Sequence, residues 1–371
     1  MPNERAHGIQ LAKMCEAFIE HGADVELIVP DKKEAQKLSL RSFYNLRVDI
    51  PVTRIAVSRM TSPRLDFLVS AATFGMEHFF YLRRKRRKGE QAALYTIDLD
   101  NFSFLLIPFL GMPYVVEIHD AKPKGMLYRM LFRRARGIIA INHLIRKKLI
   151  ERFGIAEEKI IVHPNGIDTT PFQNLASEES ARAALDIPFR LYIAAYVGRF
   201  YPWKGLGVLL KAAELLEKEI AIYLVGGDYD ELLRLSGHAA IPQGLLCVGH
   251  RDFKEIPNWL AAADCVILLG TRENEYSFLH TSPMKLFEYM ASGKPIIASR
   301  TPANEEIVSS DDVFFYEPDN ARELAAKIQY VRSHPAEARE KARRARAKVE
   351  GYTWAKRAGS ILHFIEQRVG K

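Results

Sequence analysis

The sequence predicts an α/β fold of two doubly wound, Rossmann-like domains, each a parallel sheet covered by helices on both faces. Short apolar, β-branched runs alternate with helical periodicities over most of the 371 residues, as in chains of βαβ units. The runs are continuously apolar, which is typical of strands buried on both faces. The length is also too great for one ordinary hydrophobic core and favours two domains.

Buried strands are expected wherever such a run ends in a polar or turn-forming residue. In the first half of the chain these runs cover residues 25–29, 114–118, 137–141 and 159–162. In the second half they cover residues 191–197, 220–225, 245–248, 265–269, 295–298 and 313–316. Apolar residues recur at helical spacing in residues 206–217 and 285–291, and a helical pattern dense in Arg and Lys fills residues 337–371.

The domain boundary is expected just before the strand that begins at Leu191. We therefore place a first domain at residues 1–188, a second at residues 189–350 and a closing helix at residues 351–371. A doubly wound domain should open with a strand that is central in its sheet, yet residues 1–8 have the pattern of a loop that leads into a helix. We expect that this first strand is missing because upstream residues are absent; the alternative is a first sheet that is built differently.

The composition excludes several classes of protein. An apolar fraction of 48% is too high for a disordered chain, and Cys15, Cys247 and Cys265 have no CxxC spacing. A disulfide framework or a zinc module is therefore not expected. No stretch contains the roughly 20 uninterrupted apolar residues that a membrane span needs. The net charge of +8 leaves three partners open: nucleic acid, an anionic membrane or a phosphorylated small molecule.

The strongest chemical signal follows the strand that ends at Val197. Gly198 allows a turn, and Arg199 and Lys204 stand where the loop enters a helix. Free backbone N–H groups, the helix dipole and two cations together suit a diphosphate. An exposed loop with two ordinary basic residues explains the same pattern equally well.

A second signal lies at residues 280–295. Ser282 and Pro283 start a helix there, Gly293 ends it, and a strand follows. The free amides of the first turn would then point towards the strand ends of the sheet. Glu288 stands about one turn into this helix, where a carboxylate can hold a ribose diol. Taken alone, a surface helix with a structural glutamate is the simpler interpretation.

In combination, and along nearly the whole chain, the motifs resemble the retaining GT-B glycosyltransferases of group 1, which are family 4-like and move a sugar from a nucleotide-sugar donor. Residues 3–22 resemble the first loop and helix of this family, and residues 117–120 its histidine at a strand end. Further similar segments are the interdomain turn at 164–168, the nucleotide loop at 224–228, the start of the next strand at 262–264 and the closing segment at 352–354.

The resemblance implies a role for each matched residue. Arg199 and Lys204 would neutralise the donor diphosphate as it leaves, and His119 would face the donor sugar from the first domain, across the cleft. These three are the candidate catalytic residues, and Glu288 would bind the ribose hydroxyls. The closing helix would return to the first domain. The other donor contacts would come from the backbone at Gly8, from Gly226 and Gly227 beneath the nucleoside, and from the amides around Ser282, Pro283, Met284, Lys285 and Leu286.

One position departs from the family, which often has a Glu–seven residues–Glu pattern that ends at the residue matched by Glu288. In this sequence His280 occupies the position of the first glutamate in that pattern. No carboxylate stands out as the nucleophile of a covalent intermediate, so we expect displacement on one face, with the leaving phosphate taking the acceptor's proton. Asp98-Leu99-Asp100 matches a metal motif of the other glycosyltransferase fold but lies away from the donor motifs. We therefore expect no metal and no cofactor besides the nucleotide-sugar co-substrate.

Basic residues gather on the expected acceptor side. The basic run 83–88 follows an apolar, aromatic stretch, and residues 126–134 mix apolar, aromatic and basic side chains at helical spacing. Such stretches suit an anionic membrane surface or a lipid-linked phosphate, and a solvated face explains them equally well. Residues 1–188 and 333–371 each have a net charge of +6, whereas residues 189–332 have one of −4.

We therefore expect a cytoplasmic enzyme that transfers a hexose-type sugar to a glycan or lipid-linked acceptor and binds no nucleic acid. Peripheral attachment at the inner face of an anionic membrane is left open. A nucleotide-sugar epimerase on the same fold is the first alternative. A basic nucleic-acid-binding protein is the alternative from a different class, although the sequence has no recognisable reading helix, zinc module or aromatic RNA-binding motif.

Overall fold

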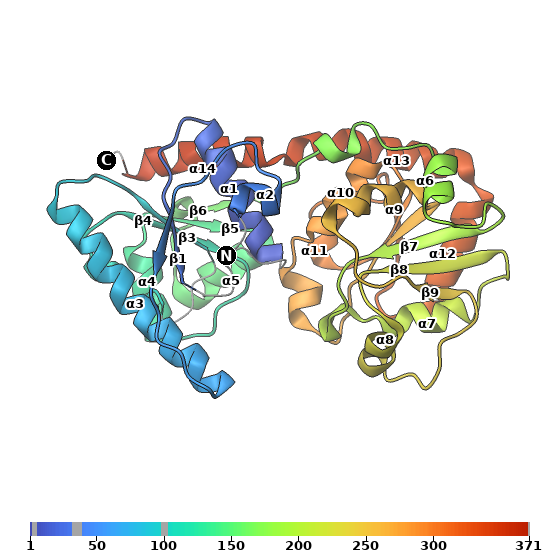
Figure 1. Ribbon diagram of the computed structural model, residues 1–371, viewed down its shortest axis with the longest axis horizontal. Helices are drawn as coiled ribbons and strands as arrows, with labels where there is room; N and C mark the ends of the chain where they lie inside the picture. The colour runs from blue at the N-terminus through green and yellow to red at the C-terminus, as the bar shows by residue number, and fades with distance from the viewer. Residues whose placement is uncertain (2–5, 32–38, 98–102, 370–371) are drawn as a thin grey trace. The chain divides into compact units, whose positions relative to one another are not determined.

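The computed structural model describes residues 1, 6–31, 39–97 and 103–369 (Figure 1). Contacts divide the chain into two compact units, Met1–Gly166 with Trp354–Lys371, and Ile167–Thr353. The first unit therefore ends at Gly166, earlier than the boundary at residue 188 that we expected. The reason is that α6 (Glu178–Ala184) packs on the second unit. Its Arg182 donates to the Ala262 carbonyl at 2.9 Å and to the Asp264 carboxylate at 2.6 Å.

The second unit contains a six-stranded parallel sheet with the strand order β12-β11-β10-β7-β8-β9. Its strands are β7 (Tyr192–Val197), β8 (Ile220–Val225), β9 (Leu245–Cys247), β10 (Cys265–Leu268), β11 (Ile296–Ser299) and β12 (Phe314–Tyr316). Besides α6, its helices are α7 (Gly207–Ala213), α8 (Tyr229–Ser236), α9 (Ile256–Ala262), α10 (Met284–Ser292), α11 (Pro302–Glu305), α12 (Ala321–Ser333) and α13 (Pro335–Val349).

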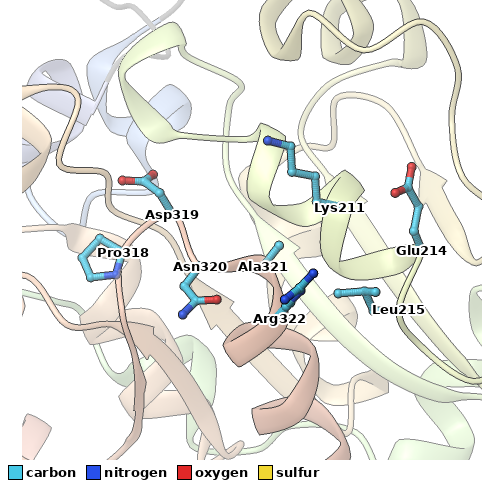
Figure 2. A pocket seen from close by; sticks show the side chains of 8 residues that line it. All are labelled: Lys211, Glu214, Leu215, Pro318, Asp319, Asn320, Ala321 and Arg322. Atoms are coloured by element: carbon cyan, nitrogen blue, oxygen red, sulfur yellow. The ribbon is translucent and has the colours of Figure 1, made fainter.

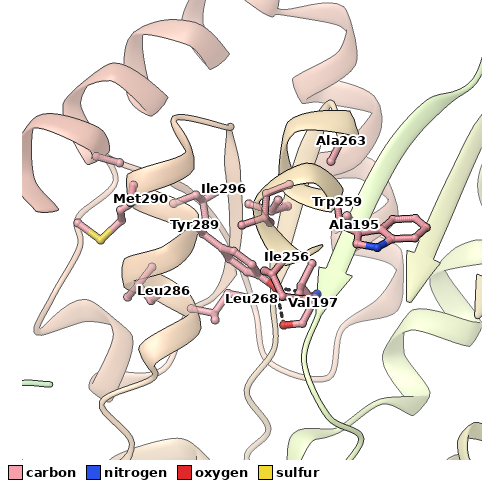
Figure 3. Close-up of a cluster of buried hydrophobic side chains, with 14 of the residues drawn as sticks. Ala195, Val197, Ile256, Trp259, Ala263, Leu268, Leu286, Tyr289, Met290 and Ile296 are labelled. Atoms are coloured by element: carbon pink, nitrogen blue, oxygen red, sulfur yellow. Dashed lines mark hydrogen bonds between the residues drawn. The ribbon is translucent and has the colours of Figure 1, made fainter. Parts of the chain in front are cut away.

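Alternate side chains of these strands enter two separate cores, one on each face of the sheet. Ala195 and Val197 of β7 pack with residues of α9, α10 and α13 (Figure 3). Ala194 and Tyr196, which point the other way because successive strand residues alternate, pack with residues of α7, α8 and α12. This arrangement confirms the doubly wound architecture that the continuous apolar runs predicted.

The first unit contains a four-stranded parallel sheet, β3-β4-β5-β6, and a separate parallel pair, β1-β2. Its strands are β1 (Leu27–Pro30), β2 (Val52–Ile55), β3 (Leu94–Ile97), β4 (Tyr114–Ile118), β5 (Gly137–Ala140) and β6 (Ile160–Val162). Its helices are α1 (Ala6–Glu20), α2 (Leu40–Tyr44), α3 (Pro63–Arg87), α4 (Met126–Arg134), α5 (His143–Phe153) and α14 (Trp354–Val369).

The closing helix α14 belongs to the first unit and packs on α1 and β5. The ring of Phe364 fills the space beside Gly137, where any Cβ would overlap it. A second ring contact joins Phe18 of α1 to Tyr95 of β3, with centroids 5.4 Å apart. The core on the other side includes Leu131 of α4 and Ile145 of α5. Helices thus cover both faces of this sheet.

The strands that the sequence predicted are present, with ends shifted by no more than two residues. Two further strands, β2 and β3, were not predicted, and the helical pattern at 337–371 is interrupted between α13 and α14. The expectation of a missing first strand stays a prediction, because α1 is the first element that the structure describes. No described helix is both long and apolar enough to cross a membrane.

Candidate functional site

The order of the strands reverses in the middle of the six-stranded sheet. β7 lies between β8 and β10. The chain runs outwards from β7 through β8 and β9, and then returns to the other side of β7 at β10. Ligands of parallel α/β sheets bind outside the carboxyl ends of the strands at such a switch point. The loops after β7, β8 and β10 therefore form the candidate site, and they contain most of the predicted donor-side residues.

Two glycines allow the loops after β7 and β8 to pack against each other. Gly226 has a φ of +130°, and a Cβ there would overlap the carbonyl oxygen of Gly198. A Cβ on Gly227 would overlap the ring of Phe200. The loops are also joined by a hydrogen bond, because the Gly198 N–H donates to the Val225 carbonyl at 2.8 Å. A side chain at either position after β8 would force the two loops apart.

Lys204 ends a short 3-10 turn and lies over an aromatic ring. Its Nζ is 4.4 Å from the centroid of the Trp203 ring. The next residue, Gly205, has a φ of +71°, and a Cβ there would lie 2.9 Å from Thr271 Cβ, so the turn packs on the end of β10. Burial, and then the charge of Lys285, lower the pKa of Lys204 to about 8. An anion bound beside Nζ would favour the charged form again.

Helix α10 is fixed to β7 by a buried tyrosine. The Tyr289 hydroxyl accepts from the Val197 N–H at 2.8 Å and donates to the Val197 carbonyl at 3.2 Å (Figure 3). One turn earlier, Lys285 Nζ donates to the Glu288 carboxylate at 2.8 Å, and Glu288 is almost fully buried. Lys285 also lies beside Gly198. The start of α10 and the loop after β7 therefore share one part of the sheet edge.

The amides predicted at residues 282–286 differ in what they can bind. Pro283 has no N–H group, and the Leu286 N–H donates to the Pro283 carbonyl at 2.9 Å. Ser282 is buried just before the helix. The N–H groups of Met284 and Lys285 stand in the first turn of α10, where a helix has no partners of its own for them. These two are the best-placed amides for an anionic ligand.

His119 follows β4 in the first unit, and its ring joins a buried polar cluster. Its Nε2 lies 2.6 Å from Glu117 Oε1 and 3.0 Å from Gln10 Nε2. Glu117 is fully buried, pairs with Arg357 Nη2 at 2.9 Å and accepts a hydrogen bond from the Tyr95 hydroxyl. Although burial opposes it, the charge of Arg357 holds the pKa of Glu117 well below its usual value. We did not predict these partners; the signal is an acidic residue inside an otherwise apolar strand.

Comparison with known sequences places both units in one family. Residues 8–171 match the family described as Glycosyltransferase Family 4, and residues 192–334 match Glycosyl transferases group 1. The chain belongs to the group 1 glycosyltransferases of family 4. This is a family of retaining hexosyltransferases, as the resemblance of the motifs implied.

Two curated relatives illustrate the range of similarity to this chain. The amylovoran biosynthesis glycosyltransferase AmsK of Erwinia amylovora is 30% identical over 233 residues, which cover 60% of this chain and 54% of AmsK. The MMP alpha-(1->4)-mannosyltransferase of Mycolicibacterium hassiacum is 23% identical over 347 residues, which cover 84% of this chain and 80% of that protein. The chain spans about half the length of the first curated relatives that it matches.

Solved structures of glycosyltransferases have the same architecture. A glycosyltransferase from Rickettsia africae aligns with a TM-score of 0.76 at 17% identity, over 98% of this chain and 96% of that chain. HepE of Anabaena, solved in complex with UDP and glucose, aligns with a TM-score of 0.72 at 18% identity, over 99% and 97% of the two chains. At such identities the likeness shows the fold alone, and it confirms the predicted GT-B fold.

His280, at the position where the family often has its first glutamate, is buried. It ends a π-helical turn at Tyr276–His280, and its Nε2 lies 4.0 Å from the Glu275 carboxylate. Such turns are frequent at functional sites. The ring of Tyr276 meets the Trp203 ring edge-on at 5.1 Å, so the π turn packs beside the loop that carries Lys204.

The remaining predicted residues are placed as follows. Gly8 is buried in the first turn of α1, in the first unit. Arg199 is partly buried after β7, and its carbonyl accepts from the Tyr196 hydroxyl at 3.2 Å. Asp98 and Asp100 lie outside the described residues, as does part of the first loop. No group of three or more metal-ligating His, Cys, Asp or Glu side chains occurs in the part of the chain that the structure describes. Metal independence stays a prediction.

A hollow of about 550 Å³ lies elsewhere in the second unit, between α7 and the start of α12 (Figure 2). It is lined by Lys211, Glu214, Leu215 and residues 318–322. Asp319 of this lining lies next to the candidate site, since a Cβ on Gly205 would lie 3.3 Å from its Oδ1. None of the predicted site residues lines the hollow. We therefore place the candidate site at the switch point of the sheet and not at this hollow.

Proposed function

We propose that this glycosyltransferase moves a hexose-type sugar from a nucleotide-sugar donor to a glycan or lipid-linked acceptor, with retention and without a metal. The observation that carries the proposal is the meeting of Lys204, the start of α10 and the buried Glu288 at the switch point. A cation and a helix N-terminus suit a diphosphate. The complex of HepE with UDP and glucose supports a donor of this class.

The donor-side residues would bind the donor in two ways, through their charge and through the space that they leave. Lys204 and Arg199 would stabilise the diphosphate, whose negative charge grows as the glycosidic bond breaks. Glu288 would accept hydrogen bonds from the ribose diol through the carboxylate that Lys285 already holds in place. Gly226 and Gly227 would let the nucleoside approach the backbone, because a side chain has no room there.

The proposed reaction takes place on one face of the donor sugar. The bond between the anomeric carbon and the diphosphate oxygen breaks, and the acceptor oxygen forms its bond to the same face of that carbon. The leaving phosphate oxygen takes the proton of the acceptor hydroxyl, so charge and atoms balance without an enzyme carboxylate. On the family resemblance, His119 would contact the donor sugar. Proton NMR of the product should show the anomeric configuration of the donor, and an inverted product would contradict the proposal.

Mutation of two residues tests the donor site. Lys204→Ala and Glu288→Ala should each abolish transfer and leave the circular dichroism spectrum unchanged. Lys211→Ala is the matched control, because this exposed lysine lies on α7, outside the site. Thermal-shift measurements with UDP- and GDP-sugars identify the donor base. Full transfer activity in either site variant, or loss of activity after metal removal with EDTA, would contradict the proposal.

The epimerase alternative predicts a different use of the donor. An epimerase converts the nucleotide-sugar by itself, whereas the transferase leaves it intact until an acceptor hydroxyl is present. Incubation of the protein with each donor alone, followed by chromatography of the nucleotide-sugars, separates the two. Rapid formation of an epimeric nucleotide-sugar without an acceptor would replace the transferase proposal by this alternative.

A basic, aromatic surface on the first unit supports an anionic membrane as partner. Phe80 and Phe109 are exposed, and the Arg134 guanidinium lies 5.1 Å over the Phe109 ring. Arg86 of α3 donates to the Leu110 carbonyl, so the end of α3 adjoins the turn before β4. A hollow of about 250 Å³ is lined by Met126, Arg129, Met130, Arg133 and Arg134. Arginines beside the exposed Met126 and exposed aromatic rings suit lipid phosphates at the edge of a bilayer.

Peripheral attachment at the inner, cytoplasmic face of a membrane is therefore part of the proposal. The protein should sediment with phosphatidylglycerol vesicles and not with phosphatidylcholine vesicles, and high salt should release it. Arg129→Glu with Arg133→Glu should abolish sedimentation, whereas Lys211→Glu, the same charge reversal in the second unit, should not. Binding to random DNA in preference to the anionic vesicles would favour the nucleic-acid alternative instead.

A further inference from the structure

The buried cluster around Glu117 brings together residues from four parts of the first unit. Glu117 is the next-to-last residue of β4, Gln10 lies on α1, Tyr95 on β3 and Arg357 on α14. Three donors converge on Glu117 Oε1: Arg357 Nη2 at 2.9 Å, Gln10 Nε2 at 2.6 Å and His119 Nε2 at 2.6 Å. The Tyr95 hydroxyl donates to the other oxygen. Glu117 and Arg357 are both fully buried.

Arg357 is fixed independently of this carboxylate. Its Nε donates to the Pro164 carbonyl at 2.8 Å, and Nη2 lies 3.5 Å from the His163 carbonyl. A guanidinium does not lose its proton in proteins, so this position supplies a permanent positive charge beside Glu117. The closing helix, far from β4 in sequence, therefore provides the counter-charge for a carboxylate at the end of that strand.

The state of Glu117 determines which nitrogen of His119 has a proton. An ionised carboxylate can only accept hydrogen bonds, so a nitrogen 2.6 Å from Oε1 must carry hydrogen. The proton of a neutral His119 is therefore on Nε2, inside the cluster. Nδ1 makes no hydrogen bond to the residues that the structure describes, and the His7 ring lies edge-on to the His119 ring with centroids 6.4 Å apart. Nδ1 is thus the nitrogen that remains without a proton and with a free lone pair in the neutral ring.

We propose that Glu117, itself fixed by Arg357 and Gln10, is a positioning residue that holds the His119 ring through Nε2–H and presents Nδ1 as a hydrogen-bond acceptor. A neutral imidazole held in this way would accept a hydrogen bond from a hydroxyl group, such as one on a sugar. The assignment of the proton to His119 Nε2 depends only on the contacts within the cluster. Its use in transfer rests on the proposed function, in which His119 contacts the donor.

NMR of the intact protein with 15N-labelled histidine tests the assignment directly. His119→Gln identifies the His119 signals among those of the 11 histidines. In its neutral form, the His119 ring of the wild-type protein should show a proton on Nε2 that exchanges slowly with water and no proton on Nδ1. A neutral His119 ring with its proton on Nδ1 would overturn the proposal.

A paired variant tests whether Glu117 holds this proton. Removing one partner of a buried ion pair is strongly destabilising, whereas replacing both by apolar residues is often tolerated. Glu117→Met with Arg357→Met should therefore remain folded and lose the slowly exchanging Nε2 proton. Lys356→Met, at an exposed position next to Arg357, should retain it. A slowly exchanging Nε2 proton in the folded paired variant would show that Glu117 does not position His119.

Kinetics of the same variants separate this proposal from the proposed function. If His119 acts in transfer, the paired variant should lower kcat on the order of 10- to 100-fold, because small displacements of a reacting group have effects of this size. The affinity for the nucleoside diphosphate should stay at the wild-type value, since the residues proposed to bind it are in the second unit. Loss of the Nε2 proton with unchanged kcat would contradict the role of His119 in transfer and leave the hydrogen-bond assignment intact.

Discussion

Lys204 should make the binding of a nucleoside diphosphate depend on pH between 7 and 9. Burial and the charge of Lys285 lower the pKa of Lys204 to about 8, and only its charged form attracts the diphosphate. With this pKa, ~91% of Lys204 is charged at pH 7 and ~9% at pH 9, which weakens binding about 10-fold, or by ~1.4 kcal/mol. An exposed lysine would stay charged over the whole interval.

Isothermal titration calorimetry with UDP and GDP at pH 7, 8 and 9 measures this effect. Titrations in buffers of different ionisation enthalpy should show almost no proton uptake at pH 7 and uptake of nearly one proton per ligand at pH 9. Lys204→Arg provides the decisive control, because a guanidinium stays charged and should remove the pH dependence. Lys211→Arg should leave it unchanged. An equal affinity of the wild-type protein at pH 7 and pH 9, or a 10-fold loss that persists in Lys204→Arg, would refute this reasoning.

Three further changes have expected outcomes that urea unfolding and nucleotide titration can measure. Lys204→Met should raise the free energy of unfolding at pH 7 by about 1–3 kcal/mol, since a charged lysine with a lowered pKa opposes folding below pH 8. The same variant should not bind nucleotide. A lower free energy of unfolding in this variant would contradict the burial of the lysine charge. Gly226→Ala should destabilise the protein and abolish nucleotide binding, because its Cβ would overlap the loop after β7. The control is Gly237→Ala, whose Cβ would have no atom within 4 Å; its free energy of unfolding should fall only by the strain of the positive φ. Tyr289→Phe should cost about 1–3 kcal/mol, because it leaves a buried N–H and carbonyl of β7 without their partner; an unchanged urea midpoint would contradict that role.

The second unit was largely predictable from the sequence because its strands are buried on both faces. β7, β8 and β10 appear as continuous apolar runs, and the glycines and cations that follow them mark the loops at the carboxyl ends. What the sequence could not show is how the loops fit together. The packing of Gly205 on Thr271, and the hydrogen bond from Leu286 to Pro283, depend on contacts between segments and on the local turn at the start of α10.

The first unit was less predictable because some of its strands are only partly buried. β2 and β3 are four residues long, and most of their residues are half exposed, so they lack the continuous apolar run by which the other strands were recognised. The domain boundary was displaced for a related reason. The segment after Gly166 has no strand of its own before β7, and its place in the second unit depends on Arg182, whose partners lie about 80 residues later in the chain.

Of the two charged residues in the polar cluster of the first unit, only one could be recognised from the sequence. Glu117 stands out because a carboxylate interrupts a fully buried apolar strand. Arg357 does not, since it lies in a closing segment of 10 basic residues against 4 acidic ones at 333–371, where any arginine resembles a solvated one. Only the fold shows that this arginine is fully buried and faces Glu117.

Stability alone does not account for the ion pair between Glu117 and Arg357. Both charges lose their hydration on burial, and replacing such a pair by apolar side chains of similar volume is commonly neutral or stabilising. A strand end filled by leucine and methionine would therefore hold the sheet equally well. The pair does have one effect that apolar residues cannot reproduce, because the ionised carboxylate accepts the hydrogen bond that keeps the proton on His119 Nε2, and an apolar side chain has no acceptor. The closing helix thus provides the charge that determines the hydrogen-bonding state of a histidine at the end of β4.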